Sequence, residues 1–147
     1  MLPFVAVVRT ALLSTSLTVI LMSLLGCSNN QRETAIVRGT VTVDGKPVPN
    51  GTVTFIPEVS GPPATGEINP MGQYTLTTYQ AGDGAVPGRY KIMVMALQDN
   101  NDRLPEDRSP LPAPIVPQKY LSTSTSGLTG TVEPGIENVI DLPLASK

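Results

Sequence analysis

Short runs of alternating apolar and polar residues recur along the chain, and this period of two constrains the fold more than any other feature. Successive side chains of a strand point to opposite faces, so each run predicts a strand that is buried on one face. The runs end at residues that favour tight turns, such as Asp44-Gly45 and Pro134-Gly135. Seven runs follow the pattern: Ile36–Val43, Thr52–Ile56, Ala64–Ile68, Gln73–Thr78, Arg89–Leu97, Leu128–Val132 and Glu137–Leu144. No helical period follows Glu33, so the sequence predicts an all-β, seven-stranded β-sandwich.

The alternation also assigns the core. In the run Arg89–Leu97, the face with Tyr90, Ile92, Val94 and Ala96 is expected to point inward. The other expected inward residues are Val37, Gly39, Val41, Val43, Val53, Phe55, Tyr74, Leu76, Ile140, Leu142 and Leu144. Met93 and Met95 lie on the opposite face of their run, where they form either a contact surface or an edge that a loop covers.

Proline is abundant, with 15 prolines and 13 glycines among 147 residues, while 40% of the residues are apolar. This composition predicts frequent turns around a core rather than disorder. Five prolines between Leu104 and Pro117 exclude a helix there and favour extended backbone. We expect a stiff crossover that lays Ile115, Val116 and Tyr120 on the core. Residues 122–126, which are rich in hydroxyl groups, are expected to form a solvated loop.

The beginning of the chain has the pattern of a targeting segment. After Arg9, the sixteen residues Thr10–Leu25 carry no charge, which is short for a membrane span of about 20 residues but fits the core of a signal peptide. The run stops at Leu24-Leu25-Gly26-Cys27, which resembles the bacterial lipobox. The resemblance implies that the chain is cut before Cys27 and that this cysteine is the lipidation site. Residues 1–26 are then a lipoprotein signal peptide, 27–34 the lipidated cysteine with a polar tether, and 35–147 the β-sandwich domain.

Two alternatives to a lipid anchor remain open for this segment. It could be an uncleaved anchor helix with Cys27 as a bystander thiol, or an ordinary signal peptide that is cleaved without lipidation. A lipid is favoured because Cys27 is the only cysteine, so no disulfide can form within the chain. Two or three acyl chains also anchor a protein stably, whereas one does so only marginally. Ser28 stands where an aspartate would resemble an inner-membrane retention signal, which favours the outer membrane.

Several segments together resemble one domain family. Val37–Val48 followed by Asn50–Phe55 is similar to the opening of carboxypeptidase-regulatory-like domains, which share the transthyretin-like (prealbumin-type) β-sandwich. Gly72–Leu76 and Val86–Ile92 resemble the next hairpin and the entry into a central strand, and the tail from Pro117 resembles small bacterial lipoproteins of this fold. The resemblance implies a Greek-key sandwich. In metallopeptidases that carry such a domain, it accompanies the catalytic domain and is not itself catalytic.

Composition argues against most chemistry. The chain has no histidine, which removes the commonest general base and zinc ligand, and a lipid on Cys27 would leave no thiol. The transthyretin-like hydrolases of urate breakdown rely on histidines, so that activity is not supported. A dyad of Lys119 with Ser122, Ser124 or Ser126 is conceivable but lacks an oxyanion motif. The acidic stretch Asp99–Asp107 fails the EF-hand spacing but leaves a looser calcium site open.

These observations favour a binding protein over an enzyme. No catalytic, cofactor-binding or metal-binding residue is predicted, and the net charge of −2 gives no footprint for nucleic acid. We expect a non-enzymatic structural, adhesion or accessory module of the bacterial cell envelope, held at the membrane through Cys27 next to an envelope protein partner of unknown identity. The alternative is a small-ligand or calcium-binding lipoprotein that uses the loops at one end of the sandwich.

Overall fold

The structure, a computed structural model, describes residues 31–98 and 113–146. The chain divides into two units, Met1–Gln31 and Arg32–Lys147, and the fold is that of the second unit. The predicted lipidation site Cys27 and the acidic stretch Asp99–Asp107 lie outside the described residues.

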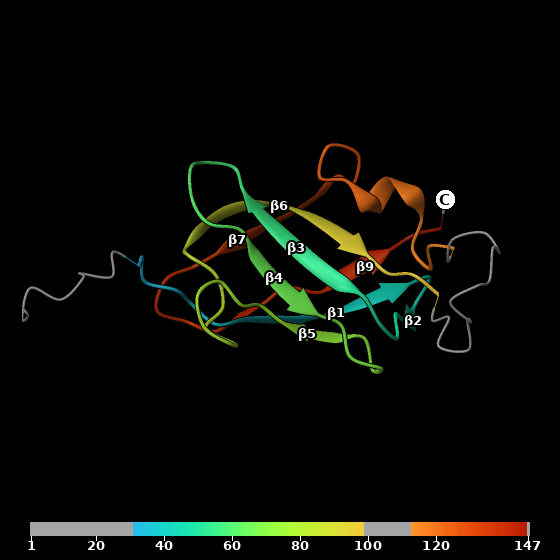
Figure 1. The fold of residues 1–147 in the computed structure, drawn as a ribbon, viewed down its shortest axis with the longest axis horizontal. Helices are drawn as coiled ribbons and strands as arrows, with labels where there is room; N and C mark the ends of the chain where they lie inside the picture. Colours follow the sequence, from blue (N-terminus) through green and yellow to red (C-terminus); the bar gives the residue numbers. More distant parts are fainter. Residues whose placement is uncertain (1–30, 99–112, 147) are drawn as a thin grey trace, which may run out of the picture. The chain divides into compact units, whose positions relative to one another are not determined.

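The described residues form two open β-sheets with almost no helix, as Figure 1 shows. One sheet has four strands in the order β4-β3-β6-β7, and every neighbouring pair is antiparallel. These strands are β3 (Thr52–Pro57), β4 (Ala64–Glu67), β6 (Gly88–Met95) and β7 (Leu128–Val132). The all-β prediction is therefore confirmed, and the two sheets are consistent with a β-sandwich.

The other sheet has five strands arranged around β1 (Val37–Val43). The antiparallel partners of β1 are β2 (Lys46–Pro47) and β5 (Gln73–Thr75). Its parallel partners are β8 (Asn138–Val139) and β9 (Leu142–Leu144). Because β1 is the only long strand of this sheet, the shorter strands depend on it for their position.

The core lies between the two sheets and follows the predicted inward faces. Val37 and Val41 of one sheet and Val53, Phe55 and Ile92 of the other are fully buried. Phe55 is in contact with aromatic rings of both sheets, at centroid distances of 6.2 Å to Tyr74 and 5.8 Å to Tyr90. Tilted rings at these distances pack favourably beyond the area that they bury. Apolar contact between the layers therefore holds the fold together.

The last predicted strand, Glu137–Leu144, is interrupted, which is one reason why the described residues contain nine short strands and do not confirm seven. In an unbroken parallel ladder, the carbonyl of Ile140 would accept the N–H of Thr40. Instead, the Tyr74 hydroxyl donates to that carbonyl at 2.6 Å, and the Asp141 carboxylate accepts the Thr40 N–H at 2.8 Å. Burial, with a smaller contribution from the charge of Asp141, raises the pKa of Tyr74, so its hydroxyl stays a donor. The other additional strand is the two-residue β2.

The proline-rich connection returns to the core as predicted. Leu97 pairs with Pro114, and the N–H of Ile115 donates to the carbonyl of Ala96 at 2.9 Å. Val116 and Tyr120 are buried, and Ile115 packs against the core. Tyr120 belongs to the short 3₁₀ helix η1 (Gln118–Leu121).

The loop after η1 differs from the expectation of a wholly solvated segment. Ser126 is buried, and its hydroxyl donates to the carbonyl of Ile92 at 2.6 Å. The same hydroxyl accepts the N–H of Leu128. A hydroxyl that satisfies two main-chain groups can be buried at little cost. The expectation of a solvated loop rested on its many hydroxyl groups and did not take such pairing into account.

The turn between β7 and β8 is held by one buried amide. The Asn138 side chain accepts the N–H of Glu133 at 2.8 Å and donates to the carbonyls of Glu133 and Ile136. It thereby satisfies main-chain groups of the turn in which the chain leaves the four-stranded sheet for the five-stranded one.

Met95, on the outer face of β6, is 47% exposed, so among the described residues no loop covers it.

Candidate functional site

The most distinctive site is the hairpin in which the chain crosses from β4 to β5. The two strands belong to different sheets, so the hairpin must open along part of its length. At its base, Thr65 and Thr77 exchange main-chain hydrogen bonds of 2.9 and 2.7 Å. At its tip, the N–H of Asn69 donates to the carbonyl of Gln73, and the Asn69 side chain accepts the N–H of Gln73, both at 2.9 Å. The hairpin is therefore closed at both ends.

The middle rung of this hairpin is missing. Continuing the register from base to tip places Glu67 opposite Thr75, but no strand pairing joins β4 to β5 there. Hydrogen-bonded pairs alternate along antiparallel strands, so the main-chain groups of Glu67 point away from β3 and those of Thr75 away from β1. Both residues are exposed. The opening thus presents strand-type main-chain groups that take part in no strand pairing among the described residues.

Gly66 explains how the strands approach without forming that rung. A Cβ atom at this position would lie 2.7 Å from the carbonyl oxygen of Thr75 and 3.3 Å from a side-chain carbon of Leu76. The Thr75 carbonyl therefore rests over the Gly66 backbone, and only glycine allows it. The close contact at Gly66 forms the floor of a groove between the diverging strands.

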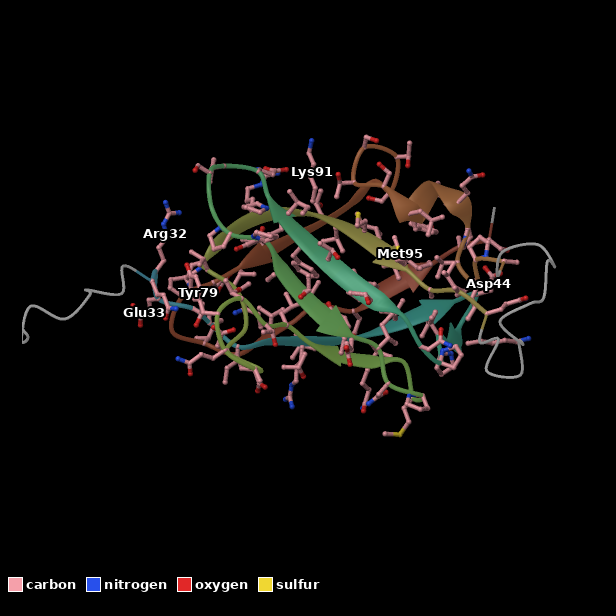
Figure 2. The ribbon with its side chains drawn as sticks, viewed as in Figure 1. Arg32, Glu33, Asp44, Tyr79, Lys91 and Met95 are labelled. Carbon is pink, nitrogen blue, oxygen red and sulfur yellow. The ribbon has the colours of Figure 1, made fainter. Side chains whose placement is uncertain are left out.

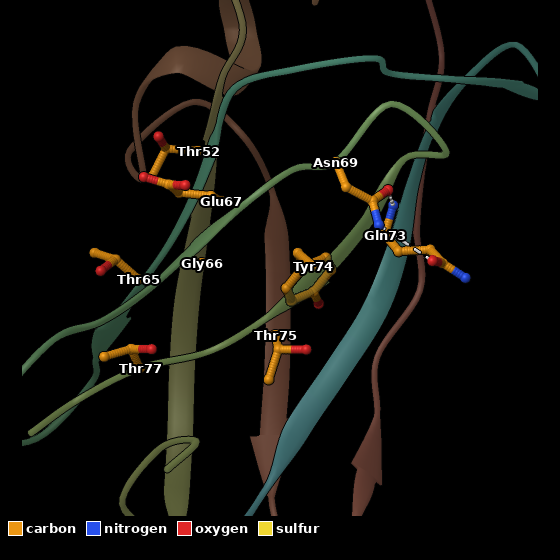
Figure 3. A pocket seen from close by; sticks show the side chains of 9 residues that line it. All are labelled: Thr52, Thr65, Gly66, Glu67, Asn69, Gln73, Tyr74, Thr75 and Thr77. Carbon is orange, nitrogen blue, oxygen red and sulfur yellow. Dashed lines mark hydrogen bonds between the residues drawn. The ribbon is translucent and has the colours of Figure 1, made fainter. Parts of the chain in front are cut away.

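Polar side chains surround this groove, which has a volume of about 660 Å³. Figure 3 shows the side chains of both strands around the opening, with Thr65 beside Thr77 and Glu67 beside Thr52. The lining residues are Thr52, Thr65, Gly66, Glu67, Asn69, Gln73, Tyr74, Thr75 and Thr77. A smaller cavity of about 400 Å³ shares Gln73, Tyr74 and Thr75 and continues onto the outer face of the five-stranded sheet.

The chemistry of the groove is that of hydrogen bonding. Its hydroxyl and amide groups both donate and accept, and Glu67 is the only charged residue in its lining. Across the described ranges, no group of three or more acidic, histidine or cysteine side chains could hold a metal ion. The groove is therefore suited to a ligand that offers alternating donors and acceptors.

Asp83 fixes the loop that follows the base of the groove. Its carboxylate accepts the N–H groups of Thr78 at 2.7 Å, Tyr79 at 2.9 Å and Gln80 at 3.1 Å. Burial opposes the charged form, but the main-chain hydrogen bonds together outweigh it and hold the pKa of Asp83 below its ordinary value. The loop is thus stabilised by the ionised carboxylate.

This arrangement predicts a pH-dependent stability. The pKa of Asp83 is lower in the folded state than in the unfolded state. Its contribution to stability is therefore complete above the unfolded-state pKa of about 3.9 and is lost as the pH falls through the folded-state pKa. We expect Asp83→Asn to lower the Tm by a few degrees at pH 7 and to flatten the fall of Tm below about pH 5. Calorimetry from pH 7 to pH 3 measures both effects. If the Tm of both proteins falls in parallel as the pH is lowered, Asp83 does not have this role. Hydrogen bonds from Ser146 also lower the pKa of Asp44, but Asp44 is present in both proteins and affects them equally.

The serine hydroxyls of the conceivable serine–lysine dyad are engaged in the loop after η1. The hydroxyls of Ser122 and Ser124 lie 2.8 Å apart and bond to each other, and Ser126 is occupied by the main chain. The ammonium group of Lys119 lies over the ring of Tyr120, 4.9 Å from its centroid. These side chains therefore have structural partners in the loop after η1.

Sequence reasoning placed a ligand site at the end loops and missed the groove along the side of the domain. The alternating threonines Thr65, Thr75 and Thr77 were the available signal, but they are also typical of ordinary strand positions that face solvent.

None of the helices in the described part of the chain has the length and apolar character needed to span a membrane.

In comparisons with known proteins, no protein-family model, no curated protein and no solved structure matches this chain.

Proposed function

We propose that the protein is a lipid-anchored module of the bacterial cell envelope that binds a partner and catalyses no reaction. The observation that carries the proposal is the apolar run that stops at Cys27 in a sequence that resembles the lipobox. Four residues separate Cys27 from Arg32, whose main-chain and side-chain N–H groups bond to Tyr79 and Ser60. The domain would therefore be held close to the membrane, and Ser28 favours the outer membrane over the inner.

The two packed sheets support a more specific proposal for the fold. We assign the domain to the transthyretin-like, Greek-key sandwiches of the carboxypeptidase-regulatory-like type. The segments that resemble this family include β1, β5 and most of β3 and β6. In that family the domain accompanies other activities, which fits a binding role better than a catalytic one.

The groove between β4 and β5 is the proposed partner site. An extended polypeptide offers alternating N–H and C=O groups, which match the unpaired main-chain groups of Glu67 and Thr75. The partner we propose is therefore an extended segment of another envelope protein, and the weakly acidic chain gives no support for nucleic acid. The alternative, a small-ligand or calcium-binding lipoprotein, depends for calcium on Asp99–Asp107.

Site-specific photo-cross-linking in intact cells tests this proposal. A photoreactive residue at Thr65, on the rim of the groove, is compared with one at Thr129, another exposed threonine at the far edge of the same sheet. We expect a discrete protein adduct from position 65 alone, and we expect Glu67→Lys to abolish it. Identical adducts from both positions, or none from position 65, would exclude the groove as the partner site.

A further inference from the structure

One end of the domain gathers the chain entry and two exposed loops, and we call it the tether end. It consists of residues 32–36, the β3–β4 loop (residues 58–63) and the β7–β8 turn (residues 133–137). The Arg32 guanidinium donates to the carbonyl of Ser60 at 3.0 Å, which fixes the loop beside the chain entry. The β7–β8 turn meets residues 33–36 around a small cavity of about 260 Å³. In Figure 1 the loop and the turn lie at the end where the domain begins, and Figure 2 shows Arg32 and Glu33 opposite Asp44.

Exposed apolar side chains mark the tether end. Val59, in the β3–β4 loop, is 73% exposed, which is the highest value for a large apolar side chain among the described residues. Ile136, in the β7–β8 turn, is 53% exposed, and Ile36 is 49% exposed. Single exposed apolar residues are common and need no explanation. Here they flank the residue at which the proposed tether meets the domain.

Charge does not attract the tether end to lipid headgroups. Glu58 pairs with Arg89 at 3.3 Å, and Glu137 pairs with Arg38 at 2.9 Å. These two carboxylates are therefore partly neutralised, but Glu33 and Glu133 of the same end have no ion pair with a described residue. The tether end thus has more acidic than basic side chains and does not attract anionic lipid. Any attraction must come from the apolar side chains, which are too few to bind a membrane without an anchor.

The lipid proposed at Cys27 supplies that anchor, and the tether that joins it to the domain is short. An extended chain spans about 3.3–3.6 Å per residue, so Arg32 lies at most about 18 Å from Cys27. Such a short connection keeps the tether end at a high effective concentration near the bilayer surface. Weak apolar contacts then become sufficient to orient the domain.

We propose that the tether end rests on the lipid surface, with Val59 and Ile136 in contact with the boundary between headgroups and acyl chains. The inference rests on the proposed lipid anchor at Cys27, and it adds a fixed orientation of the domain. The opposite end, with the turn from β1 into β2, then points away from the membrane, and the groove between β4 and β5 stands at the side, where a partner can reach it.

Fluorescence in vesicles tests the orientation. The mature lipidated protein is prepared as Val59→Cys and, as the matched control, Met71→Cys, and each new thiol is labelled with a polarity-sensitive probe. Met71 is 65% exposed and lies in the β4–β5 turn, where the neighbouring Gly72 approaches Pro47 of β2. The vesicles contain phosphatidylethanolamine and phosphatidylglycerol, with or without a quencher on the acyl chains.

On vesicles, the probe at position 59 should shift its emission to the blue and lose most of its intensity to the quencher, while the probe at position 71 should do neither. If the protein sediments with the vesicles but both probes report water, the orientation is wrong and the anchor stands. If the protein does not sediment with the vesicles, the anchor is wrong, and this inference is overturned with it.

Discussion

Replacing Gly39 with alanine is expected to destabilise the domain strongly. Gly39 lies in the middle of β1, where Tyr74 of β5 is its partner on one side and the chain around Ile140 passes on the other. An added Cβ would lie 1.9 Å from the carbonyl oxygen of Ile140 and 2.6 Å from its carbonyl carbon. Both are main-chain atoms, so no side-chain rotation can relieve the overlap. The cause is lack of space, since Gly39 does not adopt a positive φ.

The expected cost is about 3–5 kcal/mol, at the upper end for single substitutions and comparable with the total of about 5–15 kcal/mol that stabilises a small domain. Urea unfolding of the domain followed by circular dichroism measures it. Gly61→Ala is the matched control, because a Cβ there has no neighbour closer than 3.6 Å. Equal unfolding midpoints for Gly39→Ala and wild type would mean that β1 does not pass this close to Ile140.

Replacing Cys27 with serine is expected to move the protein completely from the membrane fraction to the periplasm. Each buried CH₂ of an acyl chain contributes about 0.8 kcal/mol, so two chains hold a protein that has no other strong membrane affinity. Serine has nearly the size of cysteine but offers no thiol for the lipid. Ser28→Ala is the matched control, since it changes the next residue and keeps the thiol.

Fractionation of cells by centrifugation, with a high-salt wash of the membranes, measures this effect. The salt wash removes proteins that are held by charge alone. We expect the Ser28→Ala protein to remain in the washed membranes and the Cys27→Ser protein to be absent from them. A Cys27→Ser protein that stays in the washed membranes would favour an uncleaved apolar helix as the anchor.

The strands could be predicted from the sequence because their cause is local. Val53 and Phe55, or Ile92 and Val94, alternate with polar neighbours, and a strand with one buried face is the simplest structure that satisfies this pattern. The break in the last predicted strand has a distant cause, because Tyr74 takes the carbonyl of Ile140 from the ladder. No pattern within Glu137–Leu144 contains that information.

The groove could not be predicted for a similar reason. The segments around Glu67 and Thr75 are separately typical of half-buried strands, and their sequence suggests a regular hairpin. Only the assignment of the two strands to different sheets opens the rung between them. The contact of Gly66 with the Thr75 carbonyl, which shapes the floor, likewise depends on how the sheets diverge.

The anchor, by contrast, can be inferred only from the sequence. Thr10–Cys27 combines an uncharged run, a small residue and a cysteine. Processing enzymes recognise such a pattern, and it has no role in the fold of the domain. The domain contributes the position of Arg32, which limits how far the body can lie from Cys27.

Mass spectrometry of the first peptide of the native protein determines whether Cys27 carries the lipid anchor. We expect the mature chain to begin at Cys27 and its sulfur to carry a diacylglycerol group, so that the peptide is heavier than its sequence by the mass of that lipid. A peptide that begins at Met1, or one in which Cys27 keeps an unmodified thiol, would show that the protein has no lipid anchor.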